Sequence, residues 1–423
     1  VYMKIAIIGS GGREHAICQK IKESKKVKKI ICIPGNGGTQ EIAENIKINL
    51  KDFEAIKNFL INEKINLTII GPEEPLVNGV VDFLNQNGLK VFGPDKFSAQ
   101  LEGSKIFTKK ICKSEKIPTA DFKIFTDLSS SLKYLNDKKY PLVVKADGLA
   151  AGKGVYICEE FNHAKKAVEE IFGGKFGEAN EVLIEEYLDG EEMSFFVLCD
   201  NNSYKFFNTA QDHKRVLEND KGKNTGGMGS YSPSRLYNLE LERKILNKII
   251  LPTVNYLKKK GGKYIGFLYA GLMIKNNEPY LIEYNVRMGD PECQTILPLL
   301  KNDFIEVIEN CLNSTLDKID LKWSKKKSIS IVLTSIGYPD AYDKNVLIEG
   351  LERIEKRNNQ FIFHAGTKLI NGKFFSNGGR VLNFVSMEDT FKAARESSLK
   401  SIKSLNWKNG YFRKDIGHKV IDD

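Results

Sequence analysis

The chain has 423 residues, of which 41% are hydrophobic and 28% charged. This composition is typical of soluble globular proteins and excludes collagen-like and disordered chains. Because single domains cluster near ~100–150 residues, the length predicts about three of them. No apolar run approaches the ~18 residues that a membrane span needs, and no signal-peptide pattern precedes the first strand-like segment. We therefore expect a cytoplasmic protein with no membrane partner.

The net charge of +10 comes from 64 Lys and Arg against 54 Asp and Glu. The basic residues are mostly Lys spread along the chain, without an RNP motif, a helix-turn-helix signature or a zinc finger, so no nucleic-acid partner is expected. The excess charge suits anionic, phosphorylated substrates instead. The seven cysteines are scattered and form no CxxC pair, which predicts reduced, buried thiols.

Strand-like and helix-like patterns alternate in the first hundred residues, which predicts a doubly wound parallel sheet. The predicted strands are 5–8, 29–33, 67–70 and 89–92, and the predicted helices are 13–23, 53–62 and 77–87. Further on, residues 141–188 form a compact unit with strands 141–145, 155–158 and 181–188 and a helix at 162–172. A mixed sheet follows from 193 to 283, with one helix at 239–259. Residues 328–335 and 361–384 are β-rich and precede a helix at 390–401.

The first glycine cluster, Gly9-Ser10-Gly11-Gly12-Arg13-Glu14-His15, follows a strand and begins a helix. Glycines at such a position allow a ligand phosphate to approach the helix N-terminus. The dinucleotide fingerprint fails, because Glu14 holds its third glycine position and the second strand leads to Pro34-Gly35-Asn36. A bound phosphate and a simple tight turn both remain open, as do a ligand site and an ordinary connection at Gly71-Pro72-Glu73.

The second cluster, Lys145-Ala146-Asp147-Gly148-Leu149-Ala150-Ala151-Gly152-Lys153-Gly154, is not a P-loop. Three residues separate its glycines where a P-loop has four, and it leads into a strand. It can cover phosphates as a flexible hairpin whose backbone N–H groups and lysines face the anion. A plain hairpin with solvated lysines is the alternative.

Two acidic strands follow. The segment Val182-Leu183-Ile184-Glu185-Glu186 can present its backbone to an adenine edge and a carboxylate to a ribose. Taken alone, however, it fits better a strand that leads to a solvated acidic turn. In Glu283-Tyr284-Asn285-Val286-Arg287, strand alternation places the three polar side chains on one face. A carboxylate, an amide oxygen and a guanidinium there suit magnesium beside phosphates, which we favour over a half-exposed strand face with an i, i+2 ion pair.

With these segments in order, the chain resembles the ATP-grasp superfamily and, within it, the glycinamide ribonucleotide synthetase family. The resemblance extends from Met3 over essentially the whole chain. It is carried by the two glycine clusters, the metal strand and the segments Leu101–Lys105, Gln211–Arg215, Asn224–Gly229, His364–Lys368 and Asn377–Val381. Val286 and Met288 depart from the family pattern at positions that point away from the metal.

The resemblance implies an ATP-grasp fold of mixed α/β and α+β class, with an N-terminal doubly wound, Rossmann-like domain and a C-terminal β-rich domain. The expected divisions are residues 1–104 for the N-terminal domain, 105–118 with 190–322 for the central domain, 119–189 for a lid subdomain, and 323–423 for the C-terminal domain. The implied reaction joins glycine to 5-phosphoribosylamine through a glycyl phosphate and releases ADP and phosphate. Another ATP-grasp ligase or carboxylase is the alternative, and a monomer or weak homodimer is expected.

The resemblance also implies roles for individual residues. ATP would be bound by Lys105, Lys145, Gly148, Gly152, Lys153, Gly154, Glu185, Glu186, Leu188 and Glu192, and Mg²⁺ or Mn²⁺ by Glu283 and Asn285. Lys145 and Arg287 would act on the transferring phosphoryl group, while Asp212, His213 and Asp290 are candidates for deprotonating the amine. Substrate contacts would come from Gly11, Arg13, Glu73, His213, Lys214, Gly226, Gly227, Gly378, Gly379 and Arg380.

Overall fold

The computed structural model describes residues 2–422. Strand β1 (Met3–Gly9) is the centre of an all-parallel sheet with the order β3-β2-β1-β4-β5. Ile5 and Ile7 point into one buried cluster and Ala6 and Ile8 into another, as expected when both faces of a parallel sheet are covered. The other strands are β2 (Val27–Pro34), β3 (Glu44–Asn45), β4 (Leu67–Ile70) and β5 (Val91–Phe92). The doubly wound N-terminal domain is thus confirmed.

The helices of this domain are α1 (Gly12–Lys22), α2 (Thr39–Ile42), α3 (Phe53–Asn62), α4 (Glu73–Val77), α5 (Val80–Gln86) and α6 (Lys96–Gly103). The helix expected over 77–87 is α5, which begins three residues later, at Val80, and ends one residue earlier, at Gln86. Gly79 adopts φ +88°, a left-handed conformation that ends α4 and allows α5 to begin in a new direction.

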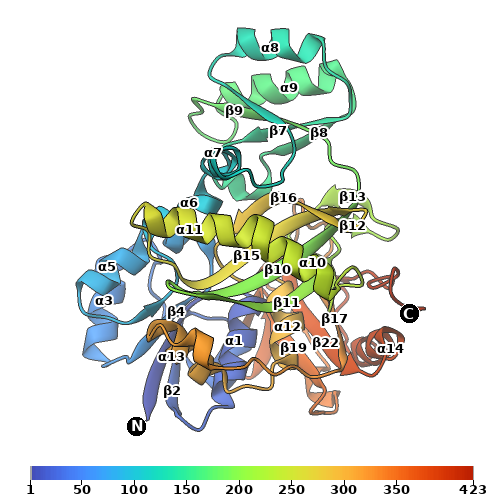
Figure 1. Cartoon of the computed structure of the whole chain (residues 1–423). Helices are drawn as coiled ribbons and strands as arrows, with labels where there is room; N and C mark the ends of the chain where they lie inside the picture. Colours follow the sequence, from blue (N-terminus) through green and yellow to red (C-terminus); the bar gives the residue numbers. More distant parts are fainter. Residues whose placement is uncertain (1, 423) are drawn as a thin grey trace.

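The lid subdomain is a four-stranded antiparallel sheet, β6-β9-β7-β8, with two helices on one face. Its elements are β6 (Phe122–Phe125), α8 (Leu128–Asn136), β7 (Leu142–Ala146), β8 (Val155–Cys158), α9 (Phe161–Phe172) and β9 (Val182–Glu186). The inward residues, among them Val144 and Ile184, form a core that belongs to the lid alone. In Figure 1 the lid stands above the rest of the molecule, joined to it near α7 (Lys105–Glu115).

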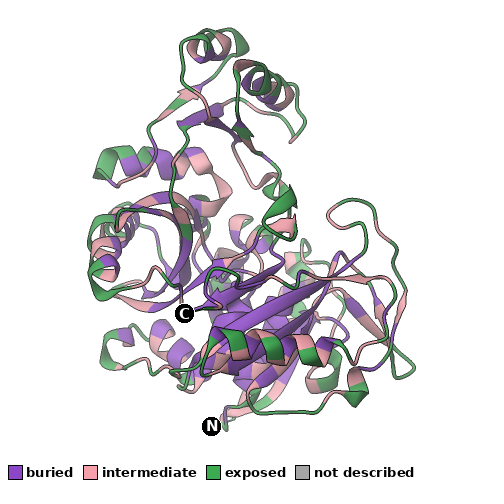
Figure 2. Cartoon of the chain, turned by 90° about the vertical axis from the view of Figure 1, so that its right-hand side faces the viewer, coloured by how far each residue is buried: buried purple, intermediate pink, exposed green. Residues whose placement is uncertain are grey.

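The central and C-terminal regions share one sheet, with the order β16-β15-β10-β11-β14-β17-β22-β19 and with β23 paired to β17. The strands are β10 (Glu191–Asp200), β11 (Tyr204–Asp212), β14 (Gly229–Ser232), β15 (Ile265–Lys275), β16 (Glu278–Asn285), β17 (Lys327–Ser335), β19 (Gln360–His364), β22 (Arg380–Glu388) and β23 (Gly410–Tyr411). β14 pairs with β17 across the boundary expected at 322/323, so the two regions are continuous through backbone hydrogen bonds. Figure 2 shows the strands of this sheet buried and the outward helix faces exposed.

Successive residues of β10 alternate between two cores. Phe195 and Val197 face the cluster that includes β16, and Phe196 and Leu198 face the cluster that includes α13. The remaining elements are α10 (Leu239–Ile245), α11 (Leu251–Lys259), α12 (Glu292–Ile296), α13 (Phe304–Leu312), α14 (Phe391–Ile402), the hairpin β12 (Arg215–Leu217) and β13 (Lys221–Asn224), and the small sheet of β18 (Leu347–Ile348), β20 (Thr367–Ile370) and β21 (Lys373–Ser376).

The helix expected over 239–259 is present, although it is not α-helical throughout. One wider π turn over Leu246–Ile250 separates α10 from α11. Pro252 lacks an N–H group and cannot continue the ordinary hydrogen-bond ladder, so the wider turn accommodates it. Within residues 2–422, no helix is both long and apolar enough to cross a membrane.

Candidate active site

The lid presents a buried ion pair on the face opposite its own core. β7 and β9 are antiparallel neighbours, and alternation puts Lys145 and Glu185 on the same face. Lys145 Nζ lies 3.2 Å from Glu185 Oε1, and both side chains are about 95% buried, with exposed fractions of 6% and 5%. Two strands distant in sequence thus bring together two residues expected to contact the nucleotide.

Helix α7 brings two more lysines to this place. Lys109 Nζ lies 3.4 Å from Glu185 Oε1 and donates to Thr119 Oγ1 at 2.6 Å. Lys105 Nζ donates to the Gly148 carbonyl at 2.8 Å. Burial lowers the pKa of both lysines, and the charge of Lys145 lowers it further. Two buried ammonium groups, Lys109 and Lys145, and the partly buried Lys105 provide strong attraction for an anion.

The glycine loop between β7 and β8 is tied at its base and open at its tip. Ser104 Oγ and Ile106 N donate to the Asp147 carboxylate at 3.1 and 3.2 Å, which fixes the base to the start of α7. Gly148 and Gly152 have φ of +83° and +73°, and a Cβ at either would meet open space. Ala150 and Ala151, at φ +47° and +50°, hold strained left-handed backbone. The tip, with exposed Lys153, is therefore free to move over a ligand.

Strand β16 carries the predicted metal ligands. Glu283 and Asn285 are two residues apart and share one face, both partly exposed. Among the described residues, neither side chain forms a hydrogen bond or an ion pair, so their oxygens are free to bind a cation. Lys105 and Glu283 are close enough for the carboxylate to raise the pKa of the lysine. A carboxylate and an amide oxygen fit a hard divalent cation.

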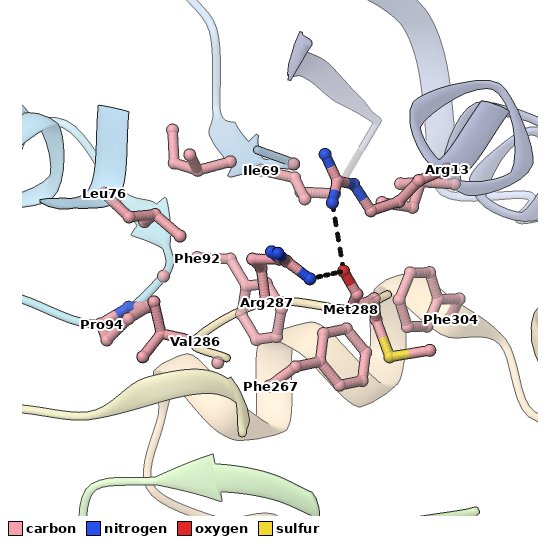
Figure 3. Close-up of a pocket in the computed structure, with 15 residues that line it drawn as sticks. Arg13, Ile69, Leu76, Phe92, Pro94, Phe267, Val286, Arg287, Met288 and Phe304 are labelled. Carbon is pink, nitrogen blue, oxygen red and sulfur yellow. Dashed lines mark hydrogen bonds between the residues drawn. The ribbon is translucent and has the colours of Figure 1, made fainter. Parts of the chain in front are cut away.

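Arg287, expected on the same face, is anchored in the structure to the N-terminal domain. Its Nη2 lies 3.0 Å from Glu102 Oε2 and its Nε 3.4 Å from Glu73 Oε2. Glu102 Oε1 also accepts the Val286 N–H at 2.8 Å. Arg287 and Arg13 both donate to the Met288 carbonyl, as the dashed lines in Figure 3 show. The cavity beside them is about 20 Å³, too small for a substrate.

A second group of predicted substrate residues gathers around Asp290. Arg380 Nη1 donates to the Asp290 carbonyl at 2.7 Å and to Gly227 O at 3.4 Å. A Cβ at Gly226 would lie 2.9 Å from the Arg380 guanidinium, so only glycine permits this approach. Burial alone would raise the pKa of Asp290, but Arg380 and Arg13 hold it below its usual value. Gly378 lies in the same turn, its Cα against the backbone of Gly366, and a Cβ at Gly379 would strike the Tyr338 ring.

The Gln211–Lys214 segment links the two groups. Lys214 Nζ lies 3.0 Å from Glu192 Oε2, and the charges of Glu192 and Asp212 raise the pKa of the lysine. Burial raises the pKa of Asp212, against the opposing charge of Lys214. His213 uses both ring nitrogens inside the protein: Nε2 accepts the Gly417 N–H at 3.0 Å, and Nδ1 lies 3.5 Å from Asp220 Oδ1.

The first glycine cluster surrounds the carboxylate of Glu14, the residue that follows Arg13 in α1. Glu14 Oε1 accepts the Gly11 N–H at 3.0 Å and Oε2 lies 2.6 Å from Arg13 Nε. A Cβ at Gly9 or Gly71 would strike the Glu14 side chain. Glu14 thus occupies the concavity where a dinucleotide fold would bind pyrophosphate, which explains the missing third glycine. The backbone N of Arg13 lies 3.4 Å from Asp290 Oδ2, so Gly11 and Arg13 border the second group.

Several residues of the site were missed from the sequence. Lys109 lies one helical turn after Lys105, and this i, i+4 spacing could have indicated it. Glu102 and Glu292 gave no such signal, because their environments depend on distant segments. Burial and the charge of Asp212 raise the pKa of Glu292 to about 8. Of the other residues expected at the nucleotide, Glu186 accepts the Asp121 N–H through Oε1, and Leu188 lies in the connection to β10.

Comparison with known proteins decides the family. Sequence models of phosphoribosylglycinamide synthetase match the chain in three parts: the N domain over residues 3–102, the ATP-grasp domain over 103–293 and the C domain over 328–419. The chain belongs to this family. Its other name is glycinamide ribonucleotide synthetase, and the resemblance found in the motifs is confirmed.

Relatives of the family match over nearly the full length. A phosphoribosylamine–glycine ligase of Caldanaerobacter subterraneus is 44% identical over 98% of this chain and 99% of its own. One of Haemophilus influenzae is 45% identical over 99% of each chain. The crystal structure of phosphoribosylamine–glycine ligase from Thermotoga maritima superposes with a TM-score of 0.85 at 30% identity, covering 98% of this chain and 100% of that one. A biotin carboxylase domain from Hydrogenobacter thermophilus shares the fold, with a TM-score of 0.73 at 15% identity over 97% of this chain and 92% of that one.

Proposed function

We propose that this chain is an ATP-dependent ligase that joins glycine to 5-phosphoribosylamine through a glycyl phosphate and releases ADP, phosphate and glycinamide ribonucleotide. Full-length similarity to phosphoribosylamine–glycine ligases supports the substrates. The observation that carries the chemistry is the convergence of Lys105, Lys109 and Lys145, with Lys105 within electrostatic range of the Glu283 carboxylate.

Activation of glycine comes first, since a carboxylate is a poor acyl donor. The phosphoryl group passes through a loose transition state, so positioning and charge neutralisation are the contributions the protein can make. Lys105 and Lys145 would hold the phosphates, and Lys109 would keep Glu185 in place. The loop over Gly148, Gly152, Lys153 and Gly154 would close over the nucleotide and exclude water.

The divalent cation fits the residues present. Glu283 and Asn285 would hold Mg²⁺ or Mn²⁺, and the bound ion supplies charge neutralisation between the ATP phosphates. The related biotin carboxylase domain was solved with MgADP, which supports the same nucleotide–metal pair here. Arg287, anchored by Glu102, would place its guanidinium beside the transferring group.

The amine would be captured at the second group. Arg380 and the backbone of Gly378 and Gly379 would face the 5′-phosphate of phosphoribosylamine, with Gly226 and Gly227 alongside. Asp290 is held ionised by two arginines, and His213 has no free ring nitrogen. Asp212, whose pKa is raised by burial, therefore remains the better proton acceptor for the attacking amine.

We also infer a cytoplasmic monomer or weak homodimer that acts on small molecules and has no nucleic-acid partner. The seven cysteines are all free and buried, which fits a reducing compartment.

The test is a product analysis with purified enzyme, ATP, Mg²⁺, glycine and freshly generated phosphoribosylamine. We expect ADP and phosphate to accumulate only when glycine and the amine are both present. Lys109→Met should abolish most of this turnover, whereas Lys110→Met, on the exposed side of the same helix, should leave it unchanged. Formation of AMP and pyrophosphate would reject the proposal, and so would turnover with another amine or carboxylate but not with these substrates.

A further inference from the structure

The hairpin β12–β13 projects from the site with very little apolar packing. None of the residues in its two strands is buried, and Leu217 is 49% exposed. Since buried apolar area is the usual source of local stability, such a hairpin would open readily by itself. Its position must therefore come from polar contacts.

Those contacts come from the segment Tyr411–His418, which begins in strand β23 and continues into the turns that follow it. Arg413 is fully buried and pairs twice with Asp415, Nε to Oδ1 and Nη2 to Oδ2, both at 2.8 Å. From there Nη1 donates to the Arg215 carbonyl at 3.0 Å, and Nη2 lies 3.0 Å from Asp220 Oδ1. One planar guanidinium thus binds the first residue of β12 and the turn that precedes β13.

Five further contacts run in parallel. Asn219 N donates to Asp415 Oδ2 at 2.9 Å, Lys414 N to Glu218 Oε1 at 3.1 Å and Tyr411 Oη to the Val216 carbonyl at 2.8 Å. His418 Nε2 lies 2.9 Å from Asp220 Oδ2, and Gly417 N donates to His213 Nε2. We name Tyr411–His418 together with its partners in 213–220 the C-terminal clasp.

The chemistry of His213 excludes a metal ion as the purpose of this cluster, although His213, Asp220 and His418 lie close enough to share one. Nε2 of His213 accepts a backbone N–H, so in the neutral ring the proton resides on Nδ1 and points at Asp220. The Asp220 carboxylate also forms an ion pair with Arg413. The cluster is an arrangement of hydrogen bonds and ion pairs.

Both ends of the clasped hairpin lead into the site. On one side, Lys214 pairs with Glu192, and on the other, the Gly227 carbonyl accepts a hydrogen bond from Arg380 Nη1. The two sides are tied together, because Thr225 N donates to the Lys214 carbonyl at 2.7 Å and Met228 N to the His213 carbonyl at 2.7 Å. A shift of the hairpin would move Lys214 and the Gly226–Gly227 turn with it.

We propose that Arg413 is a positioning residue for the ligation: through the C-terminal clasp it fixes the β12–β13 hairpin. It thereby places Lys214 beside Glu192, which is expected to contact ATP, and Gly226–Gly227 at the phosphoribosylamine site. The kinetic part of this proposal rests on the proposed function. The structural part, that the clasp immobilises residues 215–227, does not.

The experiment compares Arg413→Ala, Arg413→Lys and Asp220→Asn with the control Arg357→Ala, which removes an exposed ion pair with Glu355 in the loop before β19. Hydrogen exchange of the full chain is measured peptide by peptide, with the thermal midpoint recorded alongside. We expect exchange over residues 215–227 to accelerate about tenfold or more in Arg413→Ala and less in Arg413→Lys, with the parallel sheet unchanged. Arg357→Ala should behave as wild type.

Steady-state kinetics supplies the second readout. We expect the KM for ATP and for phosphoribosylamine to rise about fivefold or more in Arg413→Ala while kcat changes less than about twofold, and Arg413→Lys should recover part of the loss. Unchanged exchange in a folded variant would overturn the proposal, as would faster exchange with all KM values unchanged. If Arg413→Ala does not fold, Asp220→Asn, whose side chain is 39% exposed, decides by the same criteria. A wild-type enzyme without ligase activity would refute the proposed function instead, and the exchange data would still test the clasp.

Discussion

The pair Arg287–Glu102 offers a quantitative test of how the site is anchored. Arg287 follows strand β16, whereas Glu102 lies at the end of α6 in the N-terminal domain. Their side chains are 16% and 7% exposed, and Nη2 and Oε2 are 3.0 Å apart. Glu102 also accepts the Val286 N–H, so one carboxylate fixes two consecutive residues after the proposed metal ligands. We expect Arg287→Met and Glu102→Gln to be energetically coupled.

The structure sets the size of that coupling. At an effective dielectric constant of 20, two charges 3.0 Å apart attract by about 5.5 kcal/mol before desolvation is subtracted. Removing one partner of a buried pair costs ~3–5 kcal/mol, because the other charge stays buried. Glu102→Gln should cost less, since glutamine still accepts the Val286 N–H and Arg287 keeps Glu73. The free energy of unfolding lost in the double variant should therefore be about 2 kcal/mol smaller than the sum of the two single losses.

A pH series provides an independent check. Burial raises the pKa of Glu102 even in the presence of Arg287, and loss of the arginine would raise it further. A carboxyl with a raised pKa contributes stability that is present at low pH and is lost as pH rises through its folded-state pKa. Arg287→Met should therefore lose less stability at pH 5 than at pH 8.

Urea unfolding of the four proteins of the cycle, at both pH values, measures these quantities. Strict additivity of the two single losses would refute the reasoning, because it would mean that Arg287 and Glu102 do not stabilise each other. A larger loss for Arg287→Met at pH 5 than at pH 8 would contradict the assigned cause of the raised pKa.

Four further predictions follow from the same contacts. The loop Ala146–Gly154 should exchange its amide hydrogens more slowly when a non-hydrolysable ATP analogue is bound, and unchanged exchange with binding confirmed would contradict its role as a cover. Glu283→Gln should lower turnover by two to three orders of magnitude, a loss of about 3–4 kcal/mol. The control Glu278→Gln changes another glutamate of β16, which forms an exposed ion pair with Lys244, and it should leave turnover unchanged. Equal activity of the two variants would remove Glu283 from the metal site. Arg380→Ala should raise the KM for phosphoribosylamine and leave those for ATP and glycine nearly unchanged, and an equal rise in all three would indicate general damage. Because the pKa of Glu292 is raised to about 8, its contribution to stability is full below its unfolded-state pKa and is lost as pH rises through 8. Glu292→Gln should abolish this loss, which is worth ~1.4 kcal/mol per pKa unit. Parallel pH–stability curves for wild type and variant would contradict this prediction.

The local part of the fold could be predicted from sequence patterns. Apolar runs identified β4, β8 and the buried part of β1, and a polar helix-like pattern over 53–62 identified α3 with its observed bounds. The breaks were harder. Gly79 ends a helix through its backbone conformation and Pro252 forces a wider turn, and both effects are visible only when the surrounding packing selects them.

Pairing between distant segments was not accessible in this way. No local pattern predicts that β14 pairs with β17, since the two strands lie about a hundred residues apart in the sequence. The same limit applies to the site. The motifs indicated Lys145 and Glu185 separately, but their contact depends on the β7–β9 register. Glu102 became visible as the partner of Arg287, and His213 as part of the C-terminal clasp, only when the chain was folded.

The central claim, activation of glycine as an acyl phosphate, is tested most directly by the fate of the glycine carboxylate oxygens. Glycine labelled with ¹⁸O in both oxygens is converted by the enzyme with ATP, Mg²⁺ and phosphoribosylamine, and the products are analysed by mass spectrometry. The account predicts that inorganic phosphate carries one ¹⁸O per turnover, because the glycine oxygen that attacks the γ-phosphorus leaves with it, and that ADP carries none. Unlabelled phosphate, or label recovered in AMP, would contradict it.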